Sequence, residues 1–253
     1  EQKWSFEHAK LMGFDCNEVV DEETGELDWD GFFIFNNNFN YIEQITDFIN
    51  ELLDAQSKGE LDYDLLFLWD SVGSVPCKMT FDGKGGKMHN ASTLADKIGM
   101  GINQRISGSR RADSKYENTL LIVNQPWVQL PDNPFGQPKI KSKGGEAIWL
   151  NSSLVFLFGN QKDAGTTTIS AVKNKRKVKF ASRTKISVMK NHINGLGYAD
   201  GKIIVTPHGF LAGKESTEEK KSIEKYKGEQ SEYWKEVIGV EGDFKLEEEK
   251  KEQ

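Results

Sequence analysis

Four short, continuous apolar runs constrain the fold of this chain more than any other feature of its sequence. They span residues 32–35, 65–69, 119–123 and 154–158. Such runs are typical of strands buried on both faces of a mainly parallel sheet. Apolar side chains with helical spacing lie between them, at Ile42 to Leu53 and at Leu94 to Ile106. This alternation predicts a three-layer α/β domain with ligand sites at the carboxyl ends of its strands.

The pattern changes after residue 166. Residues 166–180 and 182–190 read as antiparallel strands around a turn at Asn174 and Lys175, so the predicted sheet is mixed. From Lys214 onward, alternating charges with spaced aromatic side chains predict one or two surface helices, followed by a solvated tail over residues 245–253. We therefore expect a core over residues 1–213 and a charged helical segment over residues 214–253.

Charge is divided unevenly along the chain. Residues 1–70 carry 18 acidic and 3 basic side chains, whereas residues 139–192 carry 12 basic and 2 acidic ones. A segment this basic indicates a polyanionic partner such as nucleic acid, or else a solvated basic hairpin that offsets acidic neighbours. Charge alone leaves both interpretations open.

Cysteine content and hydropathy bear on the compartment. The two cysteines, Cys16 and Cys77, show neither metal-ligand spacing nor a disulfide pattern, which favours a reducing compartment. The printed sequence has no apolar run of membrane-spanning length and no signal-peptide pattern. We expect a cytoplasmic protein without a membrane partner.

Polar side chains follow two of the apolar runs. Asp70 and Ser71 end the run "LLFLWDS", where a carboxylate needs a cation or hydrogen-bond donors. A magnesium nucleotide supplies both, as in the Walker B strand of P-loop NTPases; capping of a following helix is the alternative. Asn124 and Gln125 end the run "TLLIVNQ", where they can contact a phosphate or simply satisfy loop backbone.

Two loops rich in glycine and lysine follow these strand ends. The first, "KMTFDGKGGKMHN", leads into the helix that carries Lys97. The second spans residues 126–145, contains four of the six prolines, and ends in two glycines before a predicted helix start. So long a connection is usually functional, and lysines with apolar wedges suit single-stranded nucleic acid; a plain surface loop is the alternative.

Taken in order, "LLFLWDS", the first loop, "NTLLIVNQ", "FGQPKIKSKGG", the basic hairpin and "KISVMKNH" resemble RecA-type DNA recombinases, meaning bacterial RecA and its phage relatives. The resemblance covers about residues 1–211, and the stretch from Asn124 to Gly145 is its most specific part. It implies a RecA-like P-loop ATPase core with a mainly parallel twisted sheet, an antiparallel hairpin extension and a short helical C-terminal segment.

The resemblance also implies roles for single residues, with ATP and Mg²⁺ as cofactors. Glu1 would orient the hydrolytic water, Asp70 with Ser71 beside it would act on Mg²⁺, and Gln125 would sense the γ-phosphate. Lys190 would reach a neighbouring subunit's ATP, and His8 lies where an aromatic ring often stacks on adenine. His192 departs from the family, which has a second lysine there.

The two loops would contact DNA. The residues that the resemblance assigns to this contact are Lys84, Lys87, Lys97, Lys139, Lys141, Lys143, Gly144 and Gly145. Contacts to phosphates carry no base information, so we expect no sequence specificity. The expected partners are single-stranded and double-stranded DNA and further copies of the chain in a helical filament.

The printed sequence contains no G-x-x-x-x-G-K-[ST] motif, and in the family this motif precedes the position of Glu1. The simplest expectation is an N-terminal truncation, with weak or no ATP binding by these residues alone. The function implied is ATP-dependent recombination and repair, with pairing and exchange of strands. The alternatives are a non-catalytic single-strand DNA-binding paralogue and a RecA-fold motor of the hexameric-helicase kind.

Overall fold

A computed structural model describes residues 4–108, 114–129, 139–143, 146–159, 166–173, 176–206, 209–212 and 245–246. The chain divides into two compact units. Unit 1 comprises residues 1–6 and 16–152, and unit 2 comprises residues 7–15 and 153–253. Across the described ranges, no helix combines the length and apolar character that a membrane span requires.

A parallel pair of strands organises unit 1. Strands β3 (Leu66–Asp70) and β4 (Thr119–Val123) pair in register from Leu66 opposite Thr119 to Asp70 opposite Val123. Both coincide, within one residue, with apolar runs predicted as strands. Because the pair is parallel and ends in register, the chain leaves β3 and β4 at the same edge of the sheet.

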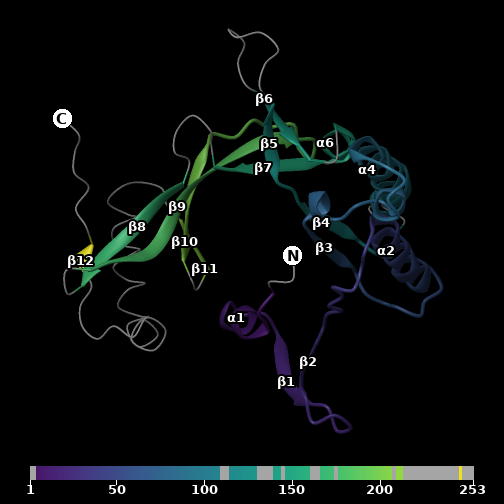
Figure 1. Cartoon of the computed structure of the whole chain (residues 1–253), viewed down its shortest axis with the longest axis horizontal. Coiled ribbons are helices and arrows are strands. Elements are labelled where there is room, and N and C mark those ends of the chain that lie inside the picture. The colour runs from purple at the N-terminus through teal and green to yellow at the C-terminus, as the bar shows by residue number, and fades with distance from the viewer. Residues whose placement is uncertain are drawn as a thin grey trace. The chain divides into compact units, whose positions relative to one another are not determined.

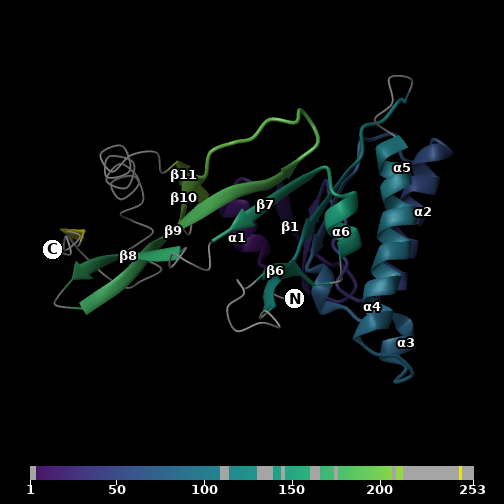
Figure 2. The ribbon, with the colours of Figure 1, turned by 90° about the horizontal axis from the view of Figure 1, so that it is seen from above.

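Helices cover one face of this pair, as Figure 2 shows for α2, α4 and α5. These helices are α2 (Ile42–Ser57), α4 (Lys87–Leu94), the π-helix η2 (Ala95–Ile102) and α5 (Asn103–Gly108). Both predicted helical stripes are confirmed, since Ile42, Ile49, Leu94 and Ile102 are all buried. Helix α2 stops before Gly59, whose φ of +78° suits a helix C-terminus.

The opposite face of the pair is exposed among the described residues of unit 1. Leu66 and Leu68 on β3 are 63% and 62% exposed, and Leu121 and Val123 on β4 are 54% and 47% exposed. Burial on both faces, which the continuous apolar runs predicted, is therefore wrong for these two strands. Trp69 and Ile122 face the helices instead, because successive side chains on a strand point to opposite sides.

The apolar run at residues 32–35 is not a strand, which corrects the prediction. Phe33 and Phe35, two residues apart, both lie against the ring of Phe6, at centroid distances of 5.3 Å. Trp4 and Trp29 complete this aromatic cluster. The run is apolar because it packs rings together, which a periodicity argument cannot distinguish from a buried strand.

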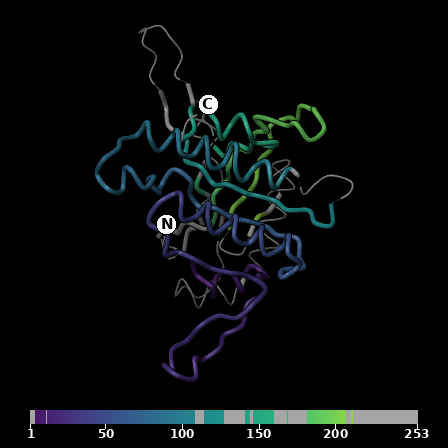
Figure 3. The backbone as a smooth tube through the Cα atoms, turned by 90° about the vertical axis from the view of Figure 1, so that its right-hand side faces the viewer, coloured from purple at the N-terminus to yellow at the C-terminus, as the bar shows by residue number. Residues whose placement is uncertain are grey.

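An acidic hairpin completes the N-terminal part of unit 1. Strands β1 (Cys16–Val20) and β2 (Leu27–Gly31) pair antiparallel and form the lower purple arm in Figure 3. In the turn, the carboxylate of Asp21 accepts hydrogen bonds from the backbone N–H groups of Thr24 and Glu23 and from the Thr24 hydroxyl. These bonds hold the pKa of Asp21 below its usual value.

Unit 2 is built around one long strand. Strand β9 (Arg176–Asn191) pairs antiparallel with β8 (Thr166–Lys173) and then β7 (Leu154–Phe158) along one edge, and with β10 (Gly201–Thr206) along the other. Strands β11 (Gly209–Ala212) and β12 (Lys245–Leu246) extend the sheet. Figure 1 shows β8 and β9 as a long ribbon. The predicted antiparallel pair on either side of residues 174–175 is confirmed.

The protein is therefore mixed α/β, with a small parallel sheet and several antiparallel ones. A mainly parallel sheet is wrong for the described residues, since only β3 and β4 pair in parallel there and β7 joins the antiparallel sheet. Lys245 and Leu246 pair with β8, so this part of the predicted solvated tail is also corrected. The helices predicted after Lys214 lie outside the described residues, and the boundary at residue 213 stays a prediction.

Candidate functional site

Polar side chains gather where the chain leaves β3 and β4. Asp70, the last residue of β3, is exposed, whereas Ser71 is buried and shares a 2.5 Å hydrogen bond between its Oγ and that of Ser74. Asn124 and Gln125 follow β4 directly. Because Asp70 pairs with Val123, the in-register parallel strands bring both predicted pairs to one edge. Their proximity was the expectation drawn from the two apolar runs.

The segment after Gln125 is not the structureless connection that its composition predicted. Strands β5 (Pro126–Gln129) and β6 (Lys139–Ser142) form an antiparallel hairpin in which Trp127 pairs with Lys141. Pro126 thus begins a strand, which is a position that tolerates the missing N–H. The helix predicted after the two glycines is present as α6 (Glu146–Asn151).

Lys143 joins the end of this hairpin to both parallel strands. Its backbone carbonyl accepts a 2.8 Å hydrogen bond from Nδ2 of Asn124, and its ammonium donates a 3.0 Å bond to Oε1 of Gln125. Its side-chain stem passes over Gly73, in the 3-10 helix η1 (Val72–Ser74), where an added Cβ would come within 2.7 Å of Cβ and Cδ of Lys143. A basic side chain of the hairpin is thereby fixed at the strand ends.

Lys141 has a different environment. Its ammonium lies 3.8 Å from a carboxylate oxygen of Glu146, the first residue of α6; the Lys141 side chain is half-buried and that of Glu146 is exposed. Lys139 also lies on β6, but its side chain is outside the described part of the structure, as are the predicted DNA-binding residues Gly144 and Gly145. Of the predicted second-loop residues, Lys141 and Lys143 are therefore the two that have described side-chain contacts.

The oxygens at the strand ends fit a magnesium ion in part. Asp70 offers an exposed carboxylate. Mg²⁺ is commonly held by one or two carboxylates, with water and phosphate oxygens completing its shell. The Asp70 carboxylate fits this preference, and among the described residues Oδ1 of Asn124 is buried and accepts no hydrogen bond. No cluster of three or more His, Cys, Asp or Glu residues that would hold a metal by itself occurs in the described ranges.

The first predicted loop is mostly helical. Helix α3 (Lys78–Phe81) and helix α4 leave only residues 82–86 as a turn, in which Gly83 has a φ of +74°. Lys84 in this turn and Lys87 at the start of α4 are exposed. Lys97 lies on η2 and is half-buried. Two of the three predicted DNA contacts in this region are thus freely accessible.

A buried thiol anchors this helical segment. The backbone N–H of Cys77 donates to Oδ1 of Asn90 over 2.9 Å, and its Sγ lies 3.3 Å from the hydroxyl of Thr80. Burial raises the pKa of Cys77, but hydrogen bonds from the side chain and backbone of Thr80 and from Thr93 together lower it by more, so the net shift is downward. The fully buried position identifies a structural thiol.

The remaining predicted site residues lie elsewhere. Lys190 lies on β9 opposite Val155 and is half-buried, and His192 is exposed with its backbone N–H bonded to the carbonyl of Ser153. His8 is exposed on α1 (Phe6–Leu11). These three belong to unit 2, whose description is separate from that of the strand ends. Glu1 lies outside the described residues.

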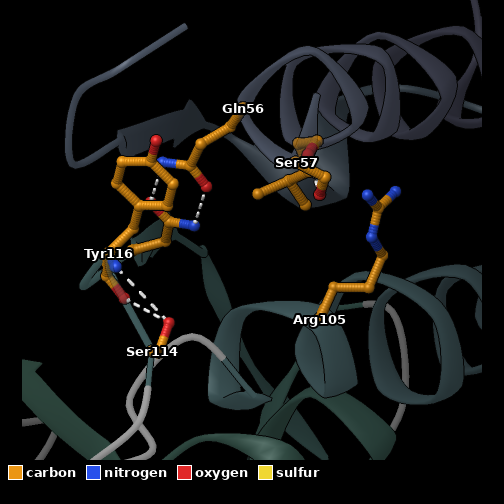
Figure 4. Close-up of a pocket in the computed structure, with 7 residues that line it drawn as sticks. Gln56, Ser57, Arg105, Ser114 and Tyr116 are labelled. Carbon is orange, nitrogen blue, oxygen red and sulfur yellow. Dashed lines mark hydrogen bonds between the residues drawn. The ribbon is translucent and has the colours of Figure 1, made fainter. Parts of the chain in front are cut away.

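A cavity of about 220 Å³ lies in another part of unit 1 (Figure 4). Its walls include Ser57, Arg105, Ser114 and the reciprocally bonded amides of Gln56 and Asn118. The Arg105 guanidinium is already bonded to Asp54 and Asn50. Ser114 follows residues 109–113, which are not described, so the boundary of the cavity on this side is not defined. We assign the cavity no function.

Sequence reasoning missed three residues that support predicted site residues through direct contacts. Gly73 admits the stem of Lys143, Ser74 bonds Ser71, and Glu146 pairs with Lys141. The string "DSVGSV" contained a weak signal, since a glycine between two serines after a strand permits close approach of another segment. Nothing in the sequence indicated which segment that would be.

The chain matches no known protein-family model and no curated protein.

Proposed function

We propose that this protein is a RecA-type recombinase that binds single-stranded DNA, assembles on it as a filament, and pairs and exchanges it with double-stranded DNA, with ATP and Mg²⁺ as cofactors. The observation that carries the proposal is the contact of Lys143 with Asn124 and Gln125. It joins the β5–β6 hairpin to the strand edge at which α/β proteins bind ligands. A polymer site and a nucleotide site are then neighbours in unit 1.

The chemistry of the strand ends supports the nucleotide part of the proposal. Asp70 would hold Mg²⁺, which when bound would neutralise charge on a nucleotide's phosphates. Gln125 would contact the terminal phosphate, and Ser71 would stay buried as a support for the turn after β3. Glu1 as the water-positioning residue, Lys190 as a contributor to a neighbouring subunit's ATP, and His8 near adenine remain predictions.

The basic side chains support the DNA part. Lys84 and Lys87 are exposed on the α3–α4 segment, and Lys141 and Lys143 lie at the end of the β5–β6 hairpin. Lysines bind phosphates without reading bases. Binding of single strands of any sequence, with strong salt dependence, is the behaviour this arrangement favours.

A fluorescence anisotropy titration with labelled oligo(dT) tests the DNA part. Phosphate release from ATP with and without the oligonucleotide tests the ATPase part, measured on a chain extended upstream of Glu1 because the printed residues contain no G-x-x-x-x-G-K-[ST] motif. Tight binding at low salt with DNA-stimulated hydrolysis is the expected result. Failure to bind oligo(dT) at low salt would overturn the proposal. An Asp70→Asn variant that hydrolyses ATP as fast as the unaltered chain would overturn the assignment of the magnesium ligand.

One sequence observation favours the second candidate function, a single-strand DNA-binding protein without ATPase activity. The printed residues contain no G-x-x-x-x-G-K-[ST] motif to cradle the nucleotide phosphates. The same two measurements separate the candidates, because DNA binding without any hydrolysis by an extended chain that contains this motif supports the second and contradicts the first.

A further inference from the structure

The hydrogen bond between Gln125 and Lys143 joins a charged group to a neutral one. The ammonium of Lys143 carries a full charge, yet Oε1 of Gln125, its described partner at 3.0 Å, belongs to a neutral amide. Hydrogen bonds in which both groups are charged are shorter and stronger than those in which one is neutral. A phosphate oxygen would therefore compete well with Gln125 for this ammonium.

The rest of Lys143 is held independently of its ammonium. Nδ2 of Asn124 holds its backbone carbonyl, and its stem lies against Gly73. Loss of the bond to Gln125 would leave the residue anchored at two points, so the ammonium can change partner without displacement of the hairpin end. The exposed position of Gln125 also leaves the bond open to solvent and to ligands.

We infer that Gln125 restrains Lys143 in the DNA-free protein, and that a phosphate of single-stranded DNA takes the Lys143 ammonium from it. This inference rests on the proposed function and adds a residue that sets the affinity for DNA. Breaking the hydrogen bond between Lys143 and Gln125 uses part of the free energy of DNA binding. Gln125 therefore lowers the affinity for DNA.

Removing the acceptor should consequently tighten DNA binding. Gln125→Ala leaves the Lys143 ammonium unrestrained, and the affinity for oligo(dT) should rise by only about twofold to fivefold, because solvent weakens an exposed contact. Gln125→Glu replaces the amide with a carboxylate and should lower the affinity by about threefold to tenfold, since it adds an ion pair and a repulsive charge.

Lys141 provides the matched control for Lys143. It lies two residues earlier on the same hairpin, also binds a side chain from another element, and contacts Glu146 instead of Gln125. Lys143→Met should abolish the gain from Gln125→Ala, whereas Lys141→Met should weaken binding but preserve that gain. The comparison separates a specific restraint from a general loss of positive charge.

Anisotropy titrations of oligo(dT) against the full chain, its single variants and the two double variants measure these factors at one salt concentration. The inference is overturned if Gln125→Ala raises the affinity equally in the unaltered chain and in Lys143→Met. It is also overturned if Gln125→Ala lowers the affinity. In both cases DNA binding itself stands. Absence of oligo(dT) binding by the unaltered chain overturns the proposed function instead, and the inference with it.

A second readout covers variants that fold poorly. In nitrogen-15 spectra, the side-chain amide signal of Gln125 is identified by its loss in Gln125→Glu. Addition of oligo(dT) should shift this signal in the unaltered chain and in Lys141→Met, because the Lys143 ammonium leaves its oxygen. No shift in either protein at saturating DNA would show that the contact persists, contrary to the inference.

Discussion

The side-chain amides of Gln56 and Asn118 bond to each other in both directions, over 3.0 Å and 2.8 Å. Both residues are buried, at 5% and 1% exposed, and Oδ1 of Asn118 also accepts the backbone N–H of Leu65. The pair therefore connects the C-terminal part of α2 to the segments that lead into β3 and β4. It holds the covering helix in register with the sheet.

Replacement of one partner should destabilise unit 1. In Asn118→Leu, the buried amide of Gln56 loses both bonds to Asn118 and keeps only the one it donates to the Tyr63 carbonyl, so the free energy of unfolding should fall by about 1–3 kcal/mol. Urea denaturation measures the loss. The double variant Gln56→Leu/Asn118→Leu should lose less than the sum of the single changes, and strict additivity would contradict the coupling of the two amides.

The two faces of the parallel pair should respond differently to substitution. Ile102 is fully buried against the covered face, so Ile102→Ala should lower the free energy of unfolding by about 2–5 kcal/mol. Leu68 is 62% exposed on the other face, and Leu68→Ser should change the free energy of unfolding by no more than about 0.5 kcal/mol. Comparable losses in urea denaturation would show that the second face is covered in solution.

Asp62 should titrate below its usual pKa. A hydrogen bond from the ammonium of Lys115, then one from the hydroxyl of Tyr116, lower the pKa of Asp62 from 3.8. A depressed pKa in the folded state stabilises the protein above the unfolded-state value, and this stabilisation is lost as the pH falls through the folded-state value. Lys115→Met should raise the pKa of Asp62 toward 3.8 in a carbon-13 carboxylate titration. Tyr116→Phe should raise it less, and the reverse order would contradict the ranking.

Lys84 and Lys87 should each neutralise one phosphate of bound DNA. For single strands, the slope of log affinity against log salt concentration changes by about 0.7 for each phosphate that is no longer neutralised. Lys84→Ala and Lys87→Ala should each flatten the slope by this amount in anisotropy titrations with oligo(dT). Lys58→Ala, which removes an exposed lysine at the end of α2, should leave the slope unaltered. Unaltered slopes in both test variants would remove the α3–α4 segment from the interface.

Local patterns predicted the elements of unit 1 well where one face of an element is strongly apolar. The stripe from Ile42 to Leu53 predicted α2, and the run at residues 119–123 coincides with β4. The same reasoning failed at residues 32–35, where Phe33 and Phe35 pack into an aromatic cluster while Phe32 and Ile34 are exposed, because an apolar run fits such a cluster as well as a strand. It also failed to predict the β5–β6 hairpin, whose pairing joins segments separated by nine residues that are not described.

The sequence by itself determined α2, the helical stretch from Leu94 to Ile106, the two parallel strands and the polar residues that end them, because periodicity and strand ends are local properties of the chain. Only the tertiary structure decided that Lys143 lies on Gly73 and donates to Gln125. It also decided that one face of β3 and β4 is exposed among the described residues. These contacts depend on how segments far apart in sequence pack and which hydrogen bonds they then complete, and a linear pattern does not encode that choice.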